Sequence, residues 1–451
     1  SLIAPSLPLD VPLGPVLSSR HPIGNLPNSS RGCEKLGTER QVQSPVTGTA
    51  GTAGTPGTPR VLRAMNDRAA LDLLLEHGPL SRTRIGKLTG LSKPTASQLL
   101  ARLEAAGLVL ATGTTEGRPG PNAQLYEVNA TAAYAAGLDV TPERVLAAVA
   151  DITGRTVGEY ELPTPGKRPA RPVVRQVTDA LDGAVKAAGL ARADLRRLVI
   201  GTPGAFDPGT GRLRYASHLP GWHSPALLDE LAAALPMPVE YENDVNLVAI
   251  AEQRLGAARG HDDFVLLWNE GGLGAALVLG GRLHRGWTGG AGEVGFLPVP
   301  GTPLVRQVSR TGSGGYQELA GSQIIPRLAR ELGISPVPEG PYAEVAAALV
   351  AQAADINAGP HRRLLETYAT GLATGLASLV SVLDPELVVL SGASLTAGGE
   401  PLRGLVQAEL EELAAARPRL LVGDVREHPV LRGALESALA TTRDEVFDTS
   451  R

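Results

Sequence analysis

The sequence predicts an α/β protein that carries a small helical module ahead of its main body. Residues 60–106 have the apolar spacing of short amphipathic helices. After Ala135 the chain alternates between strand-like and helix-like segments. Residues 135–140, 145–152 and 156–163 predict three successive antiparallel strands, and residues 262–286 predict a strand pair. At 451 residues it is too long for one ordinary core. We therefore expect a small helical domain over residues 60–130 and a two-lobed α/β domain over residues 131–451.

Residues 79–106 are typical of two short helices joined by a tight turn. Their apolar side chains recur on one face of each helix, at Ile85, Leu88, Leu91, Ala96, Leu99, Leu100 and Leu103. Ser92 is a good N-cap for the second helix, and Pro94 lies in its first turn, where a missing N–H costs little. A preceding helix over residues 60–77 would complete a three-helix core.

The segment GLVLATGTTEGRPGPNAQLYEVN, which follows these helices, predicts a hairpin wing around a Gly/Pro-rich tip. Three helices followed by a wing form a winged helix-turn-helix, whose last helix suits a major groove. We therefore predict double-stranded DNA as a partner. The candidate base-reading residues are Thr95, Ser97 and Gln98, and the candidate phosphate or minor-groove contacts are Lys93, Arg102 and Arg118. The alternative is a three-helix structural module that binds no DNA.

The charge distribution agrees with this interpretation. Residues 60–127 carry nine Lys/Arg against six Asp/Glu, although the whole chain has a net charge of −4. A locally positive module on an acidic body is typical of a DNA reader with a separate second domain.

Composition excludes several other classes. The chain has one cysteine, Cys33, so an intrachain disulfide and a cysteine-ligated zinc site are excluded. No run of about 18 apolar residues indicates a membrane span, and we expect a cytoplasmic protein without a membrane partner. Residues 1–59 are rich in Pro, Gly, Ser and Thr. We expect them to be disordered, and in part foreign to the native protein.

Four loops in the body combine glycines with carboxylates. They are GTPGAFDP (201–208), YENDVNL (241–247), NEGGLGAALVLGG (269–281) and TGGAGEVGFLPV (288–299). Buried strands that end in such loops place backbone N–H groups and carboxylates at the mouth of a cleft. That arrangement suits a polyhydroxylated ligand. Taken singly, each loop is more often an ordinary turn.

Together and in this order, the loops resemble the ROK family (repressors, open reading frames and sugar kinases) over about residues 135–439. The resemblance implies an actin-like sugar-kinase fold of the ribonuclease H-like type, and the winged helix in front matches the family's repressor branch. In kinase members the Asp of E-N-D-x-N is the general base. Its match is Asp244, with Asn243 as a sugar contact. Glu293 matches the sugar-binding Glu of G-E-x-G-H, and Glu318 in GGYQELAG matches a later sugar-binding Glu.

The sequence departs from the kinase pattern at three places. The phosphate-binding D-x-G-G-T aligns with DVTPE (139–143), which lacks both glycines and adds an acidic residue that repels phosphate. The second phosphate loop keeps Gly272 and Gly274, but Glu270 adds negative charge there. The zinc loop is replaced by SRTGSGGYQE, and the zinc-binding His by Phe296. We therefore expect no phosphoryl transfer, no metal and no cofactor.

These observations predict a transcriptional regulator of the repressor type whose operator affinity is set by a sugar or sugar derivative. A ligand moves such an equilibrium only by its differential affinity for the two states. We expect a homodimer or homotetramer. One alternative is a ligand-independent DNA-binding protein whose degenerate ROK domain only dimerises, with Asn243, Asp244 and Glu293 in structural roles. The other is an active ROK sugar kinase with a fused DNA-binding module.

Overall fold

The computed structural model describes residues 59–114, 123–164, 172–207, 226–306 and 314–449, together with residues 210, 212–214, 219, 221, 222 and 224. Three predicted features therefore lie wholly or partly outside the described residues: the segment 1–59, Arg118 at the wing tip, and the first half of the segment SRTGSGGYQE, residues 309–313. Within the described part, no helix is long and apolar enough to cross a membrane.

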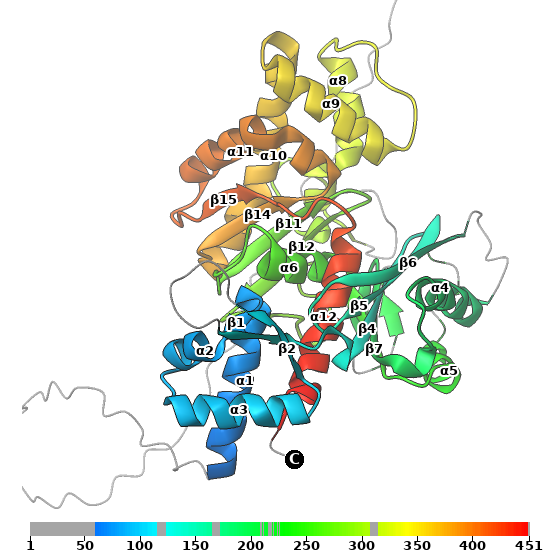
Figure 1. Cartoon of the computed structure of the whole chain (residues 1–451). Coiled ribbons are helices and arrows are strands. Elements are labelled where there is room, and N and C mark those ends of the chain that lie inside the picture. Colours follow the sequence, from blue (N-terminus) through cyan, green and yellow to red (C-terminus); the bar gives the residue numbers. More distant parts are fainter. Residues whose placement is uncertain are drawn as a thin grey trace, which may run out of the picture. The chain divides into compact units, whose positions relative to one another are not determined.

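The predicted winged helix-turn-helix is present (Figure 1). Its elements are α1 (Pro59–His77), β1 (Leu80–Ser81), α2 (Arg82–Thr89), α3 (Lys93–Ala105), β2 (Val109–Thr114) and β3 (Gln124–Val128). β2 and β3 pair antiparallel as the stem of the wing, and β1 pairs with β3 on its other side. As predicted, Ser92 caps α3, its hydroxyl accepting a hydrogen bond from the Thr95 N–H at 3.4 Å.

The apolar stripe of this module is buried with one exception. Ile85, Ala96, Leu99, Leu100 and Leu103 are buried, and Leu91 packs at the edge of the core. Leu88 is exposed, which corrects the predicted stripe. The reason is that α2 buries the face between Ile85 and Gly86, and Leu88 lies about 110° away from the centre of that face on a helix of 3.6 residues per turn.

The body contains two five-stranded sheets with the same topology. The strands of the first sheet are β4 (Tyr134–Val140), β5 (Arg144–Asp151), β6 (Thr156–Pro163), β7 (Leu195–Thr202) and β10 (Val239–Asn243), and those of the second are β11 (Phe264–Asn269), β12 (Leu273–Leu279), β13 (Arg282–Leu283), β14 (Leu387–Ser391) and β15 (Arg419–Val422). The spatial order is β10-β7-β4-β5-β6 in the first sheet and β13-β12-β11-β14-β15 in the second.

In each sheet the three strands that come first in the sequence form an antiparallel meander. The fourth strand in the sequence pairs in parallel with the first, and the fifth pairs in parallel with the fourth. This repeat confirms the predicted two-lobed, ribonuclease H-like fold.

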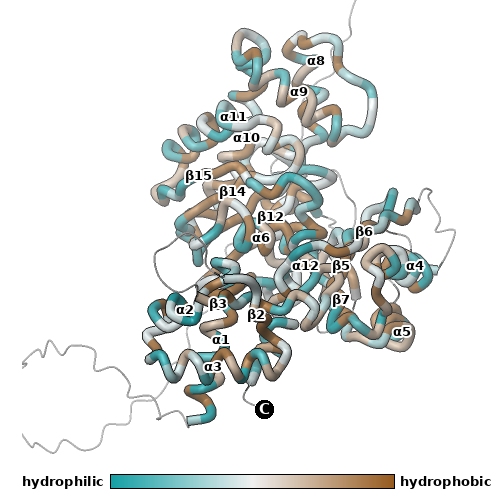
Figure 2. The backbone as a smooth tube through the Cα atoms, viewed as in Figure 1, coloured by the Kyte–Doolittle hydropathy of each residue, from teal (hydrophilic) through white to brown (hydrophobic). Residues whose placement is uncertain are grey.

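Helices cover both sheets, and a short hairpin that the sequence did not predict follows β7. The hairpin consists of β8 (Ala205–Asp207) and β9 (Arg212–Arg214). The helices are α4 (Val173–Ala187), α5 (Leu227–Ala234), α6 (Asp244–Leu255), α7 (Gly315–Ala320), α8 (Ile325–Glu331), α9 (Tyr342–Ile356), α10 (Gly359–Leu383), α11 (Ala393–Leu413) and α12 (Pro429–Val446). Figure 2 shows hydrophobic colour concentrated on the central strands β12 and β14, whereas the outer helices alternate. That pattern is expected where strands are covered on both faces.

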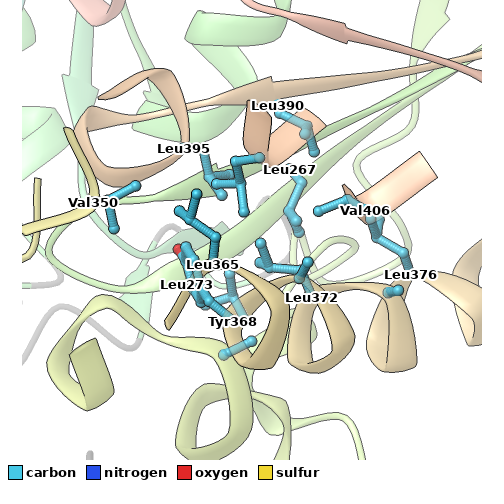
Figure 3. Close-up of a cluster of buried hydrophobic side chains, with 14 of the residues drawn as sticks. Leu267, Leu273, Val350, Leu365, Tyr368, Leu372, Leu376, Leu390, Leu395 and Val406 are labelled. Carbon is cyan, nitrogen blue, oxygen red and sulfur yellow. The ribbon is translucent and has the colours of Figure 1, made fainter. Parts of the chain in front are cut away.

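The second sheet packs against α10 and α11 through one large apolar cluster. Figure 3 shows Leu267 of β11 and Leu390 of β14 facing side chains of those two helices. The α10 residues in this cluster are Leu365, Tyr368, Leu372 and Leu376. Tyr368 keeps its hydroxyl satisfied inside the core, because it accepts a hydrogen bond from the Asn269 side chain at 2.7 Å. This core fixes the carboxyl ends of β11 and β14.

Candidate functional site

The outward face of α3 carries the predicted base-reading side chains. Lys93, Thr95 and Gln98 are exposed, whereas Ser97 is half-buried. The Ser97 hydroxyl donates to the Lys93 carbonyl at 2.9 Å and accepts a hydrogen bond from Arg82 at 3.1 Å. Ser97 is therefore held in place within the module, while Thr95 and Gln98 project from the first turns of α3.

Arg102 is tied to the module's own core. Its Nη2 lies 2.6 Å from Oδ1 of Asp67, a carboxylate only 2% exposed. A buried carboxylate needs such a partner, because an unpaired buried charge is costly. Arg102 thus links α3 to α1, and part of its side chain remains exposed.

The candidate ligand-binding residues Asn243 and Asp244 lie at the junction of β10 and α6. Asn243 is the N-cap of α6, and its Oδ1 accepts a hydrogen bond from the Asn246 N–H at 3.1 Å. Its Nδ2 donates to the Gly204 carbonyl at 3.0 Å and to Oδ1 of Asp244 at 2.9 Å. Thr202 ends β7 in register beside Asn243, and among the described residues its buried hydroxyl has no hydrogen-bond partner. These carboxyl ends of parallel strands form the edge where α/β sheets bind ligands.

Glu242 braces this junction, a role that the sequence reasoning missed. Only 9% exposed, it accepts hydrogen bonds from the Asn243 N–H at 3.0 Å and the Asn246 side chain at 2.9 Å. It also pairs with Nε of Arg285 at 2.6 Å. Arg285 lies in the loop that leads to Glu293, so Glu242 ties that loop to the start of α6. No helical spacing could have indicated this role, because Glu242 lies in β10 whereas Asn246 lies in α6.

Glu293 acts electrostatically on Asp244, whereas the described contact of Glu318 is with Gly314. Glu293 is the N-cap of the 3-10 turn Val294–Phe296, and its charge helps to raise the pKa of Asp244. Glu318 lies in α7, and its carboxylate accepts the N–H of Gly314 at the start of that helix. The structure therefore brings Asn243, Asp244 and Glu293 together. The described contacts of Glu318 are local to α7.

Asp244 is one of four carboxylates that influence one another electrostatically near the start of α6. Burial raises the pKa of Asp244 to about 7, and the nearby charges of Asp139, Glu293 and Glu270 add to the shift. Burial also raises the pKa of Asp139, of Glu293 and of Glu270. Arg144 pairs with one of these carboxylates, and its Nη2 lies 3.2 Å from Oδ2 of Asp139. Such a region favours ligands that donate hydrogen bonds and disfavours phosphate.

In the turn at residues 139–144, backbone N–H groups donate hydrogen bonds to acceptors within the turn itself. The Thr141 hydroxyl oxygen accepts hydrogen bonds from the backbone N–H groups of Glu143 at 3.4 Å and of Arg144 at 3.3 Å. The Thr141 N–H donates to the Arg144 carbonyl at 2.9 Å. In a phosphate-binding loop such N–H groups point at the ligand. Here they are already hydrogen-bonded within the turn. Among the described residues, no three His, Cys, Asp or Glu side chains are grouped closely enough to hold a metal ion.

Two ribonuclease H-like sheets behind a winged helix-turn-helix define a class of protein that joins a DNA-binding module to a sugar-kinase-like domain. A family model described as the ROK family matches residues 135–440, and a model of the MarR family matches residues 65–118. The chain belongs to the ROK family.

Relatives of two kinds are similar to this chain. A putative xylose repressor of Caldicellulosiruptor sp. is 26% identical over 356 residues, which cover 77% of this chain and 88% of that protein. A glucokinase of Halalkalibacterium halodurans is 28% identical over 281 residues, which cover 60% of this chain and 83% of that protein. The match to the repressor is therefore the longer one.

Solved structures give the same two kinds of neighbour. A ROK-family transcriptional regulator described as a homologue of the E. coli MLC protein has a TM-score of 0.65, with 20% identity. It covers 86% of this chain and 98% of its own, and at this identity it shows the fold alone. The ROK hexokinase of Thermus thermophilus has a TM-score of 0.57 and 29% identity, covering 69% of this chain and 99% of its own.

Proposed function

We propose that this protein is a DNA-binding transcriptional repressor whose affinity for its operator is set by a sugar or sugar-derived effector. The observation that carries the proposal is that a winged helix-turn-helix, whose α3 has an exposed polar face, precedes a ROK domain over residues 135–440 in one chain. The long match to xylose repressors supports the same conclusion.

The effector site lies at the start of α6. Asn243 and Asp244 sit at the carboxyl end of β10, and Glu293 approaches from the loop that Glu242 and Arg285 hold. Carboxylates that accept hydrogen bonds from sugar hydroxyls are worth more where water is excluded. We infer that Asp244 and Glu293 accept from the ligand and that Asn243 shapes the site. Glu318 stays a candidate contact from α7.

The turn at residues 139–144 and the nearby carboxylate of Glu270 disfavour phosphoryl transfer. The N–H groups of Glu143 and Arg144 are engaged by Thr141, and Asp139 and Glu270 place negative charge where a nucleotide phosphate would need donors. We infer that the chain is not an enzyme and uses neither zinc nor a cofactor. The similarity to glucokinases makes an active kinase the second candidate.

DNA recognition by one such module per operator half-site requires two copies. We propose a homodimer, or a homotetramer built from dimers, because a helix-turn-helix dimer reads half-sites about one helical turn apart or a multiple of it. Selection of bound duplexes from a random DNA library tests this directly. A two-fold symmetric consensus supports the proposal, and recovery of no consensus contradicts it.

A further inference from the structure

The core of the winged helix-turn-helix is completed by residues that lie far away in the sequence. Phe447 and Ile152 are 1% and 0% exposed, and they belong to the same apolar cluster as Leu71 of α1 and Leu103 of α3. The guanidinium of Arg68 lies 5.7 Å from the centre of the Phe447 ring, within the range of a cation–π contact. Phe447, which directly follows α12, is thus part of the apolar core of the winged helix-turn-helix.

A polar contact reinforces this apolar one. Oδ2 of the buried Asp67 accepts a hydrogen bond from the Thr449 hydroxyl at 3.1 Å, while Oδ1 accepts from Arg102 of α3 at 2.6 Å. One carboxylate therefore joins α1, the recognition helix and the segment after α12. Arg68 adds a surface link, since its Nη1 lies 2.7 Å from Oδ1 of Asp444 on α12.

The other end of α12 lies against the effector site. A Cβ atom at Gly433 of α12 would lie 1.9 Å from the Leu247 carbonyl oxygen of α6, so the two helices touch backbone to backbone. A Cβ at Gly201, at the end of β7, would meet the side chains of Leu247 and of Val430 at 2.7 Å. α6 begins at Asp244. Close-packed helices without free space between them move together.

We propose that α12 is the physical link between the effector site and the recognition helix, and that Asp67 is the positioning residue through which its C-terminal segment, Phe447–Thr449, sets the placement of α3. This inference rests on the proposed function for the identity of the two sites it joins. It does not need a known effector, because the link exists in the free protein. A shift of α6 at Asp244 is carried by α12 to Phe447 and Thr449, and from there through Asp67 to Arg102.

Two glycine substitutions of identical chemistry test the helix contact. Gly433→Ala forces α12 away from α6, whereas Gly404→Ala places the same methyl group in helix α11 where nothing lies within 4 Å. The measurement is amide hydrogen exchange of the full chain by mass spectrometry, with peptides of α10 as the internal reference. We expect Gly433→Ala to speed exchange in α1 and α3 by about threefold or more, and Gly404→Ala to leave both at wild-type rates.

Thr449→Val tests the Asp67 contact without removing the buried carboxylate. We expect faster exchange in α3 and an affinity for library-selected duplex DNA that is about three- to tenfold weaker, with Thr449→Ser restoring both. The matched control is Asp72→Ala, which removes the other partner of Arg68, within α1. It should leave both readouts within about twofold of wild type. Wild-type exchange in α3 for both Gly433→Ala and Thr449→Val overturns the inference, as does a uniform rise that includes α10.

The same variants separate this inference from the proposed function. D-Xylose and D-glucose serve as probes of effector control. If one of them changes the DNA affinity of the wild type, Thr449→Val should abolish most of that change, and an undiminished change contradicts the link. If neither sugar acts on the wild type, sugar control fails for these probes. The exchange experiment then decides the α12 link by itself.

Discussion

The side-chain amide of Asn243 donates a hydrogen bond to Oδ1 of Asp244 at 2.9 Å, and the same oxygen accepts the N–H of Val245 at 2.8 Å. Oδ1 of Asp244 is thus committed to holding the first turn of α6. The second oxygen, Oδ2, is the one we expect to accept a hydrogen bond from a ligand hydroxyl. A ligand bound there acts on the start of the helix that packs against α12.

Replacing Asp244 by alanine should weaken effector binding. A carboxylate that accepts a hydrogen bond from a hydroxyl in a desolvated site is worth about 1.5–3 kcal/mol, so we expect about tenfold weaker affinity or more. Isothermal titration calorimetry against a sugar panel measures this. Asp355→Ala, an exposed carboxylate on α9, is the control and should bind as the wild type does. Equal affinity of all three proteins would remove Asp244 from the site.

Effector affinity should depend on pH near neutrality. Because burial and neighbouring carboxylates raise the pKa of Asp244 to about 7, this group is largely protonated at pH 6 and largely charged at pH 8. The charged form is the stronger acceptor, so affinity should rise by severalfold between these two pH values. Tryptophan fluorescence offers a readout, because Trp287, in the loop before Glu293, is 95% exposed. An affinity that falls as the pH rises contradicts this role.

The stability of the protein should respond to Asp244→Asn in a pH-dependent way. The folded state holds a proton on this carboxyl up to about pH 7, whereas the unfolded chain loses it near its ordinary value of 3.8. The stability from that proton is complete below about pH 4 and is lost as the pH rises through 7. The asparagine side chain does not ionise and so does not lose this stability. The Asp244→Asn variant should therefore melt at a higher temperature than the wild type at pH 8. Each kcal/mol is worth roughly 2–4 °C. At pH 4 the gain should vanish, and a gain that is larger at pH 4 than at pH 8 has the wrong sign.

Gln98→Ala should change which sequences the protein prefers. An exposed glutamine in the first turns of α3 suits bidentate contact with adenine, and its loss should cost about 1–3 kcal/mol at one position of each half-site. Lys93→Ala should instead weaken binding to every sequence and flatten the salt dependence, as should Arg118→Ala. Glu104→Gln, exposed near the far end of α3, is the control. Unchanged preference in Gln98→Ala under competitive duplex selection assigns base reading to other residues.

The purified chain should show no phosphoryl transfer with ATP, magnesium and a broad set of sugars. The physical reason is the combination of engaged N–H groups at Glu143 and Arg144 with the negative charges of Asp139 and Glu270. A coupled ADP-release assay is the measurement. Sugar-dependent turnover that disappears in Asp244→Asn restores the kinase interpretation.

Much of the fold follows from local patterns in the sequence. The strands over residues 135–140, 145–152 and 156–163 were predicted as an antiparallel meander, and β4, β5 and β6 form one. Short elements with strong periodicity and clear turn residues are specified locally. The same holds for the Ser92 cap and for the pairing of β11 with β12.

The contacts that join distant segments could not be predicted in this way. Nothing near Phe447 in the sequence indicates that it packs beside Leu71, and nothing near Asp67 indicates Thr449 as a partner. Arg102 was predicted as a phosphate or minor-groove contact from its place on α3 alone. That prediction did not include its ion pair with Asp67. Periodicity reports which face is apolar, but the partner of a buried polar group depends on tertiary packing.

Sugar control of operator binding can be measured by fluorescence anisotropy, as the affinity of the purified full chain for its library-selected duplex with and without each sugar of a panel that includes D-xylose and D-glucose. We expect a salt-dependent, sequence-selective complex whose affinity falls by about tenfold or more with one sugar. We also expect Asp244→Ala to lose this response while binding the operator without sugar within about twofold of wild type. Tight operator binding that no sugar alters in either protein contradicts the account and makes the ROK domain a dimerisation scaffold.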